Sequence, residues 1–331
     1  MLLWKLLITG ALSGLVLGSI LMMVVVYRLA PLLQSRRQRS LRDQHQIPIP
    51  RFGGVGMAWA FFGAVGLLVW LPFEERGLGL EMLPQDRLWG LLFGALLAWG
   101  IGFADDVWTL RARWKLMGQI SLGFLAVYFG FSIESIEGPF FQKMDLGFWA
   151  IPLSVLWIVG IINALNLIDG LDGLASGITL VILITLSWLA HEMGKIELML
   201  LMVVLIGSVV SFLSFNRPPA SIFMGDSGSY FLGYLVAILS IWVCEKSSGT
   251  VSLFPLLILA VPIIDTTFSI FRRFLKGIPF YSADKDHLHH RLLAKGLTPV
   301  QAVLTLSGVS LIYGSLALSA HYFPQIQTYS Y

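Results

Sequence analysis

The segment NALNLIDGLDGLASG at residues 163–177 has the clearest chemical pattern in the chain. Its polar side chains recur at every third position between leucines and isoleucines, and they are Asn163, Asn166, Asp169 and Asp172. Steps of three residues keep neighbouring members on one side of an α-helix or a 3₁₀ turn, while Gly170 and Gly173 let a ligand approach the backbone. Two carboxylates and two amides where an apolar run ends favour a site for Mg²⁺ and phosphate groups. The alternative is a polar helix end that only caps its neighbours.

Two further motifs place aspartates at the ends of apolar runs. In GFADDVWTLRARWK, residues 102–115, the adjacent Asp105 and Asp106 precede three basic residues. FMGDSGS at residues 223–229 sets Asp226 between glycines, directly before a predicted helix whose N-terminal amides suit an anion. Carboxylates beside lysine and arginine are suited to reactions in which a metal ion and phosphates meet. An aspartate pair alone is equally typical of a structural helix end.

A histidine-rich segment ends the longest polar stretch, FRRFLKGIPFYSADKDHLHHRLLAKG at residues 271–296. A short helix that begins at Asp286 would place three of its side chains on one face, namely His287, His290 and Arg291. Zinc is the competing hypothesis for several histidines, but the chain has one cysteine, Cys244, and adjacent His289 and His290 should point apart in a helix. We therefore favour recognition of phosphate groups by histidine and arginine.

The elements that must position these motifs are membrane helices. The 331 residues are 56% apolar and 12% charged, with a mean hydropathy of +0.80. Apolar runs of roughly 17–25 residues match the bilayer core, and each must be helical to satisfy its backbone. We expect an all-α, polytopic membrane protein, a single domain over residues 1–331, with about ten spans. These are 4–33, 52–71, 88–104, 116–133, 148–168, 173–190, 196–215, 228–244, 252–271 and 300–322.

The charged residues between the runs sort by side. The odd-numbered connections carry fifteen lysines and arginines, and the other face carries Lys5, Arg76, Arg87, Lys143, Lys195 and Lys246. This bias predicts that the odd connections are cytoplasmic and that both termini are outside. On the cytoplasmic face every acidic residue is an aspartate: Asp43, Asp105, Asp106, Asp169, Asp172, Asp226, Asp265, Asp284 and Asp286. We therefore expect the active site on the cytoplasmic face.

Glycines at four-residue spacing in the first run, Gly10, Gly14 and Gly18, could let another helix approach closely. Packing within the chain is the ordinary reason for such a pattern, and a homodimer is the alternative. The single cysteine excludes a disulfide within the chain. With sparse charge, nothing suggests a nucleic-acid partner, and we expect membrane lipids around the helices.

Taken together, the motifs resemble those of the polyprenyl-phosphate N-acetylhexosamine-1-phosphate transferases. The family's elements occur in order as IPIPRFGG (47–54), GFADDVW (102–108), NALNLIDGLDGLA (163–175), FMGDSGS (223–229) and HLHHRL (287–292). The HLHHR sequence is more similar to the WecA and TagO branch than to MraY, which carries histidines followed by Phe-Glu there. A CDP-alcohol phosphotransferase is a poorer match, because no arginine follows Asp172-Gly173.

The resemblance implies a multi-pass enzyme of the bacterial cytoplasmic membrane. Undecaprenyl phosphate would attack the sugar-linked phosphorus of a UDP-N-acetylhexosamine, most simply UDP-GlcNAc, and release UMP. The cofactor would be Mg²⁺, with Mn²⁺ as a substitute. Another UDP-N-acetylhexosamine or UDP-MurNAc-pentapeptide is the alternative donor. A secondary transporter is the alternative of a different class, although it would not need carboxylates, histidines and arginines gathered on one face.

The resemblance also implies roles for individual residues. Asp226 would be the metal ligand. The catalytic candidates are Asp105, Asp106, Asp169, Asp172, His287 and His290. The substrate-binding candidates are Lys115, Asn166, Phe223 (stacked on uracil), Arg272, Arg273, His289 and Arg291. Asp105 could act as a general base or as a positioning residue, because a phosphate monoester with a second pKa of about 6 is already mostly a dianion at neutral pH.

Overall fold

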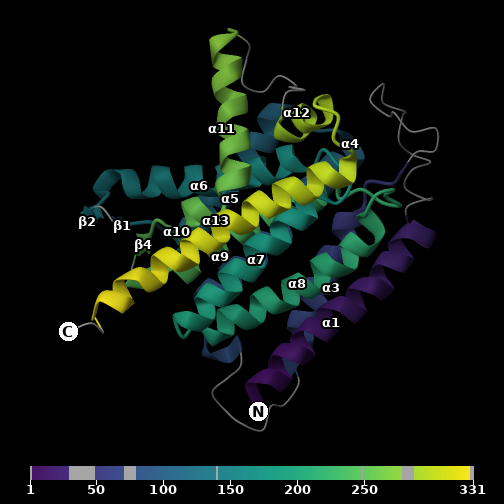
Figure 1. Ribbon diagram of the computed structural model, residues 1–331. Helices are drawn as coiled ribbons and strands as arrows, with labels where there is room; N and C mark the ends of the chain where they lie inside the picture. Colours follow the sequence, from purple (N-terminus) through teal and green to yellow (C-terminus); the bar gives the residue numbers. More distant parts are fainter. Residues whose placement is uncertain are drawn as a thin grey trace.

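The computed structural model describes residues 2–29, 49–70, 80–138, 141–247, 249–277 and 287–328. Every apolar run of the sequence is helical in it. The helices are α1 (Leu2–Val24) with the π-helical turn η1 (Val25–Leu29), α3 (Gly53–Trp70), α4 (Gln85–Trp108), α5 (Ala112–Tyr128), α6 (Ala150–Ile168), α7 (Leu174–Glu192), α8 (Ile196–Asn216), α9 (Gly225–Cys244), α10 (Phe254–Ile258), α11 (Ala260–Leu275), α12 (Leu288–Ala294) and α13 (Pro299–Thr328). The predicted helical bundle is confirmed (Figure 1).

Within the described residues, eight helices are long and apolar enough to cross a membrane. The two remaining predicted spans are α5, which has 17 residues, and the pair α10 and α11. The predicted span 252–271 is interrupted at Leu259. Pro262 explains the break, because it has no N–H to donate to the carbonyl of Ile258, four residues earlier.

Helix α9 is the centre of the bundle. All its side chains from Ser227 to Cys244 are buried, and it packs against α3, α4, α6 and α7. Glycines allow this contact, since a Cβ atom at Gly54 would clash with the backbone nitrogen of Gly228. A Cβ atom at Gly102 would likewise clash with the carbonyl group of Asp226. The start of α9, which carries the FMGDSGS motif, is therefore held closely by two other helices.

The glycines of the first helix are used within the chain. Helix α1 packs along α8, and a Cβ atom at Gly14 would clash with the carbonyl oxygen of Val204. Gly207 makes the reciprocal approach, since its Cβ atom would lie 2.5 Å from the carbonyl oxygen of Ala11. The glycine pattern is thus explained by packing between two helices of one molecule.

A small sheet, which we did not predict from the sequence, closes one end of the bundle. Its strands are β1 (Ser135–Gly138), β2 (Phe141–Asp145), β3 (Glu245–Ser247) and β4 (Thr250–Ser252), in the order β2-β1-β4-β3. Strands β1 and β4 pair in parallel, and the outer pairs are antiparallel. Such short strands in loops between helices leave too little alternation to be recognised in the sequence.

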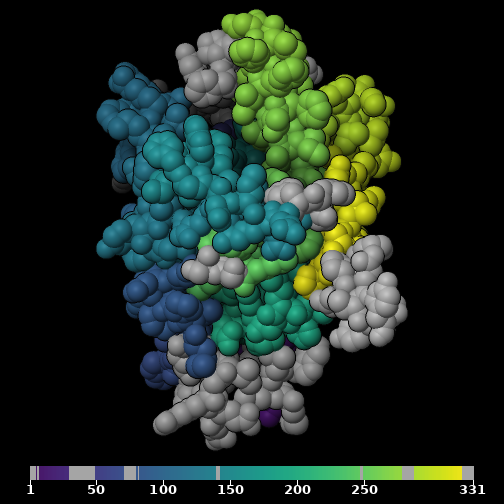
Figure 2. Space-filling model, turned by 90° about the vertical axis from the view of Figure 1, so that its left-hand side faces the viewer, coloured from purple at the N-terminus to yellow at the C-terminus, as the bar shows by residue number. Residues whose placement is uncertain are grey.

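The two ends of the bundle differ. The start of α1 and the end of α13 both lie at the end of the bundle opposite α12 (Figure 1). Helix α11 extends beyond its neighbours at the end where α12 lies, and it forms the top of the molecule in the side view (Figure 2). The end of α4 and the starts of α5 and α9 meet at that same end, where the aspartate motifs gather. Which end faces the cytoplasm stays a prediction.

Candidate active site

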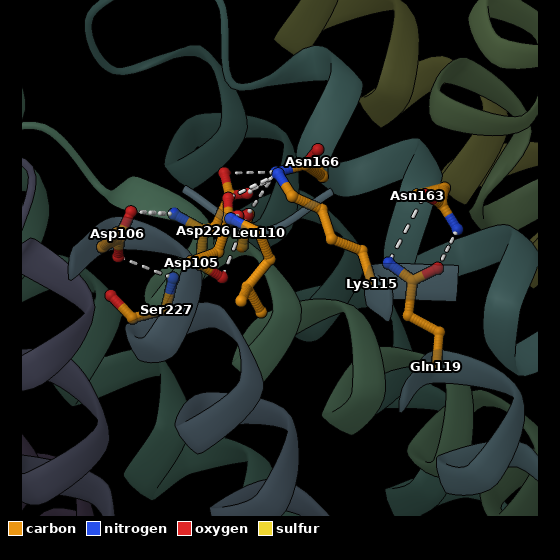
Figure 3. Close-up of polar contacts among 10 residues, drawn as sticks. Asp105, Asp106, Leu110, Lys115, Gln119, Asn163, Asn166, Asp226 and Ser227 are labelled. Atoms are coloured by element: carbon orange, nitrogen blue, oxygen red, sulfur yellow. Dashed lines mark hydrogen bonds and ion pairs between the residues drawn. The ribbon is translucent and has the colours of Figure 1, made fainter. Parts of the chain in front are cut away.

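The centre of the site is the carboxylate of Asp226 in the first turn of α9. Its Oδ2 lies 3.0 Å from Nζ of Lys115, and its Oδ1 accepts a hydrogen bond of 3.0 Å from Nδ2 of Asn166. Lys115 also forms an ion pair with Asp105 (Figure 3). Helices α4, α5, α6 and α9 therefore bring one side chain each to a common point, although the motifs that carry these side chains lie far apart in the sequence.

Asp106 faces away from this point and caps α9. Its two carboxylate oxygens accept hydrogen bonds from the backbone N–H groups of Asp226 and Ser227, both at 2.9 Å, and the side chain is buried. We expected these N-terminal amides to be available for a substrate anion, but the carboxylate of Asp106 takes two of them. The interaction suits a helix N-terminus and fixes the direction of the Asp226 side chain.

Asp105 uses both of its oxygens. Its Oδ1 accepts a hydrogen bond of 2.6 Å from the backbone N–H of Leu110, while its Oδ2 is paired with Lys115. The first contact closes the turn between α4 and α5, in which Thr109 has a positive φ of 53°. Asp105 therefore ties the turn to the lysine that follows it.

The four polar residues of the NALNLIDGLDGLASG segment (163–177) reach different partners instead of forming one row. Asn163 donates to Oε1 of Gln119 at 2.7 Å, within the bundle, and Asn166 reaches Asp226. Asp172 accepts a hydrogen bond of 3.0 Å from the backbone N–H of Ala220. Helix α6 ends at Ile168, so the three-residue repeat runs off the helix and its members diverge.

Asp169 lies where the carboxylates of the site crowd together. Burial raises the pKa of its carboxyl group to about 7, and the negative charges of Asp226 and Asp106 act in the same direction. The positive charge of Arg51 opposes them. The carboxylates of Asp106 and Asp226 therefore repel a negative charge on Asp169.

The sequence placed Arg51 among the basic residues of the first connection but did not indicate its partners. Its segment pairs with the start of the FMGDSGS motif, because Phe223 donates its backbone N–H to Pro50 at 2.8 Å and Gly53 donates to Phe223 at 2.9 Å. A Cβ atom at Gly225, whose φ is +73°, would clash with the carbonyl oxygen of Arg51. The sequence signal was the IPIPRFGG motif itself, which carried the resemblance without indicating a role for Arg51.

The histidines form a compact group beside the α6–α7 turn. Nδ1 of His287 lies 3.0 Å from Oδ2 of Asp265, whose Oδ1 accepts the backbone N–H of Leu288 at 2.8 Å. The rings of His287 and His289 are stacked with centroids 5.8 Å apart, and both side chains are buried. A Cβ atom at Gly170 would lie 2.5 Å from Nε2 of His289, so this ring lies directly against the turn that carries Asp169.

Two expectations about these histidines were wrong. Helix α12 begins at Leu288, so His287 is its N-cap and faces inward with His289, while Arg291 is exposed. The rings of His289 and His290 do not point apart, since their centroids are 4.2 Å from each other. The first turn of a short helix after an extended residue does not follow the regular spacing that we assumed. Asp286 lies outside the described residues.

His289 is a neutral histidine. Burial, together with the neighbouring His290 and His287, lowers its pKa to about 4. Neither of its ring nitrogens has a hydrogen-bond partner in the described part of the chain. A neutral imidazole offers one donor and one acceptor, so His289 can bind a polar group of a substrate but does not supply the positive charge that we expected.

The structure also shows where the remaining candidates lie in the helices. Arg272 and Arg273 lie in the last turn of α11, and Arg273 is buried. Phe223 is half-buried directly before α9. The described residues contain no group of three histidine, cysteine, aspartate or glutamate side chains arranged to hold a metal ion.

Comparison with known proteins decides the family. Residues 88–244 match the model of glycosyl transferase family 4. A probable undecaprenyl-phosphate N-acetylglucosaminyl 1-phosphate transferase of Bacillus subtilis is 38% identical over 296 residues, which cover 89% of this chain and 79% of that protein. The chain belongs to the polyprenyl-phosphate N-acetylhexosamine-1-phosphate transferase family.

Two further members support the assignment. A decaprenyl-phosphate N-acetylglucosaminephosphotransferase of Mycobacterium tuberculosis is 33% identical over 80% of this chain and 70% of its own length. An undecaprenyl-phosphate alpha-N-acetylglucosaminyl 1-phosphate transferase of Haemophilus influenzae is 29% identical over 91% of this chain and 84% of its own length. Family membership and the apolar helices make the protein a multi-pass protein of a bacterial cytoplasmic membrane. The transporter alternative is thereby removed.

Proposed function

We propose that this member of the transferase family moves N-acetylglucosamine 1-phosphate from UDP-GlcNAc to undecaprenyl phosphate. The lipid phosphate attacks the sugar-linked phosphorus, UMP leaves, and undecaprenyl-diphospho-N-acetylglucosamine stays in the membrane. The bond between the anomeric carbon and its oxygen is not broken, so the anomeric configuration is retained. The three relatives named above, each described as acting on a polyprenyl phosphate and N-acetylglucosamine, support this choice of substrates.

One observation carries the proposal: Asp226, Asp105, Asn166 and Lys115 meet at one end of the bundle although they belong to different helices. Phosphoryl transfer needs positioning and compensation of charge more than covalent participation of the protein. The site has both, because its carboxylates can hold a cation and its basic side chains can bind phosphates. The ring of His289 adds a neutral hydrogen-bonding group at the adjacent turn.

The donor set fits Mg²⁺. The candidate ligands are carboxylate oxygens, those of Asp226 first and of Asp169 second, and hard cations such as Mg²⁺ prefer oxygen. Mg²⁺ is usually held by one or two carboxylates together with substrate phosphates and water, so a preformed group of three ligands is not required. When bound, the ion would screen the repulsion between the converging phosphates and stabilise the departing UMP. Mn²⁺, with the same preference for oxygen, should substitute.

Asp105 is better suited to positioning than to general-base catalysis. Both of its oxygens are engaged, one by the backbone of Leu110 and the other by Lys115. The lipid phosphate, with a second pKa of about 6, needs no base at neutral pH. These contacts support a role in which Asp105 orients Lys115 for the phosphates.

Asp172 supports the nucleotide pocket indirectly, because it holds the loop between α8 and α9. Its carboxylate accepts the N–H of Ala220, in the loop that leads to Phe223. In our proposal Phe223 stacks on the uracil, while Arg272, Arg273 and Arg291 bind the diphosphate and the sugar. Loss of Asp172 would therefore move Phe223 and weaken binding of every uridine nucleotide alike.

A donor panel tests the proposed function. Purified protein with Mg²⁺ and undecaprenyl phosphate is supplied with radiolabelled UDP-GlcNAc, UDP-GalNAc or UDP-MurNAc-pentapeptide. The expected result is label from UDP-GlcNAc in the organic phase, an equal amount of UMP, and no transfer after EDTA. Transfer from UDP-MurNAc-pentapeptide alone would place the protein in the MraY branch. Transfer that is unaffected by EDTA would refute the role given to the metal.

A further inference from the structure

The ammonium group of Lys115 occupies the position where the carboxylates of the site converge. It contacts Oδ2 of Asp105 and lies 3.0 Å from Oδ2 of Asp226 (Figure 3). The lysine lies in the first turn of α5 and reaches across to the first turn of α9, which is 111 residues away in the sequence. In the described structure Lys115 thus acts as the cation of the acidic centre.

A divalent cation cannot share this position with Lys115. Both would use the same Oδ2 of Asp226, and two positive charges about 4 Å apart repel each other by several kcal/mol at an effective dielectric constant of about 20. Asp169 adds a carboxyl group to the negative charge around Asp226. Oδ2 of Asp226 can therefore bind either the ammonium group of Lys115 or the metal ion, but not both at once.

We propose that Lys115 and the divalent cation compete for the carboxylate of Asp226, and that Lys115 leaves Asp226 on cation binding to contact a substrate phosphate. This inference rests on the proposed function and adds a sequence of events to it. One lysine offsets part of the negative charge of the site and becomes a phosphate ligand only when the metal is present.

The side chain of Lys115 is suited to this change of partner. It is 27% exposed, and the Asp226 side chain is 25% exposed, so neither is locked by packing. Lysine carries its charge on four rotatable methylene groups, which allows the ammonium group to move by several ångströms without a change in the backbone. Asp105, whose side chain is only 8% exposed, stays in place and can guide the lysine in both positions.

Binding of Mn²⁺ without substrates tests the competition. The full-length protein in detergent is titrated with Mn²⁺, and free ion is measured by electron paramagnetic resonance. Lys115→Met should bind Mn²⁺ about tenfold or more tightly than the wild type, because close charge pairs commonly contribute at least this much to binding. The same variant should transfer little sugar phosphate, because it has no ammonium group at position 115 to contact the substrate phosphate. Tighter metal binding together with lost turnover is the signature of competition.

Two control variants show whether the charge of Lys115 causes the change. Lys115→Arg keeps the competing charge and should bind Mn²⁺ as weakly as the wild type. Lys143→Met removes a lysine that pairs with Asp145 at 3.2 Å on the exposed strand β2, and it should change neither Mn²⁺ affinity nor turnover. Equal or weaker Mn²⁺ binding by a monodisperse Lys115→Met protein would overturn the inference. A wild type that binds Mn²⁺ but transfers no sugar phosphate would instead refute the proposed function.

Discussion

The two ends of the bundle each contain a group of charged side chains, but carboxylates outnumber basic side chains in only one of them. At the sheet end, Arg87 and Glu245 form a bidentate pair with distances of 2.5 and 3.2 Å, and Gly249 donates a further hydrogen bond to Glu245. Lys195 donates to three backbone carbonyl groups at the end of α9, those of Trp242, Val243 and Glu245. Each of these charges has its partner, and the contacts close the end of a helix.

At the site end, negative charge exceeds positive charge. Asp105, Asp106, Asp169 and Asp226 lie together, and the basic groups that act on them are Lys115 and Arg51. A structure gains nothing from such an excess, because crowded carboxylates raise the pKa of one another. An excess of carboxylates over basic side chains therefore distinguishes a site that can bind a cation from a structural cluster.

The strongest loss of activity is expected from changes at Asp226. Asp226→Ala should abolish turnover, and Asp226→Asn should leave a folded protein whose turnover is lower by about a thousandfold or more, because the metal would lose its main ligand. The assay is sugar-phosphate transfer at saturating Mg²⁺, with size-exclusion chromatography to show that the variant is folded. Turnover of Asp226→Asn within tenfold of the wild type would remove the proposed metal site.

Arg51 and Arg36 allow a controlled comparison of two variants, because both residues lie in the connection between the first and second apolar runs. Arg51→Gln should lower kcat/KM by about tenfold to a hundredfold, the equivalent of one charge-assisted contact. Arg36 lies outside the described residues, and we assign it, as one of the fifteen basic residues of the odd-numbered connections, to membrane topology, so Arg36→Ala should change little. A well-folded but inactive Arg36→Ala enzyme would contradict that assignment.

The excess charge should make metal binding depend on pH. The pKa of Asp169 is raised to about 7, so its carboxyl group is protonated below this pH and must lose the proton to assist a cation. Mn²⁺ affinity should therefore fall as the pH drops from about 8 to about 6. In Asp169→Asn the affinity should be lower at pH 8 and nearly constant over this range. An unchanged pH profile in the variant would show that another group titrates.

A substitution at the sheet end should lower stability and leave activity nearly unchanged. Glu245→Gln removes one charge from the Arg87 pair, and it should lower the free energy of unfolding by about 1–3 kcal/mol while kcat stays within about twofold of the wild type. Thermal unfolding in detergent and the transfer assay measure the two effects. A large loss of turnover without a loss of stability would break the distinction between the two ends.

Much of the fold could be predicted from the sequence, because the requirement for helices in a membrane leaves few choices. The apolar runs form helices, and the ends of these helices bring the acidic motifs together. The roles of Asp105 and Asp106 could not be separated in advance. These neighbours have the same chemistry, and only the direction of α4 sends one to Lys115 and the other to the amides of α9.

Other features depended on contacts between distant segments. The position of Arg51 follows from backbone hydrogen bonds between residues 50–54 and residues 223–224. A local sequence pattern cannot predict such a contact between distant segments. The inward position of His289 follows from the absence of a side chain at Gly170. In contrast, the break before α11 could have been predicted from Pro262, whose effect inside a long apolar run we did not weigh.

The fate of the sugar-linked phosphorus atom of the donor distinguishes transfer of a sugar phosphate from transfer of a sugar. UDP-GlcNAc labelled with ¹⁴C in the sugar and ³²P in the sugar-linked phosphate is supplied with undecaprenyl phosphate and Mg²⁺. We expect both labels to enter the lipid in equal amounts, and neither to enter it with Asp226→Asn. Transfer of ¹⁴C without ³²P would show that the sugar moves without its phosphate, and it would contradict the proposed reaction.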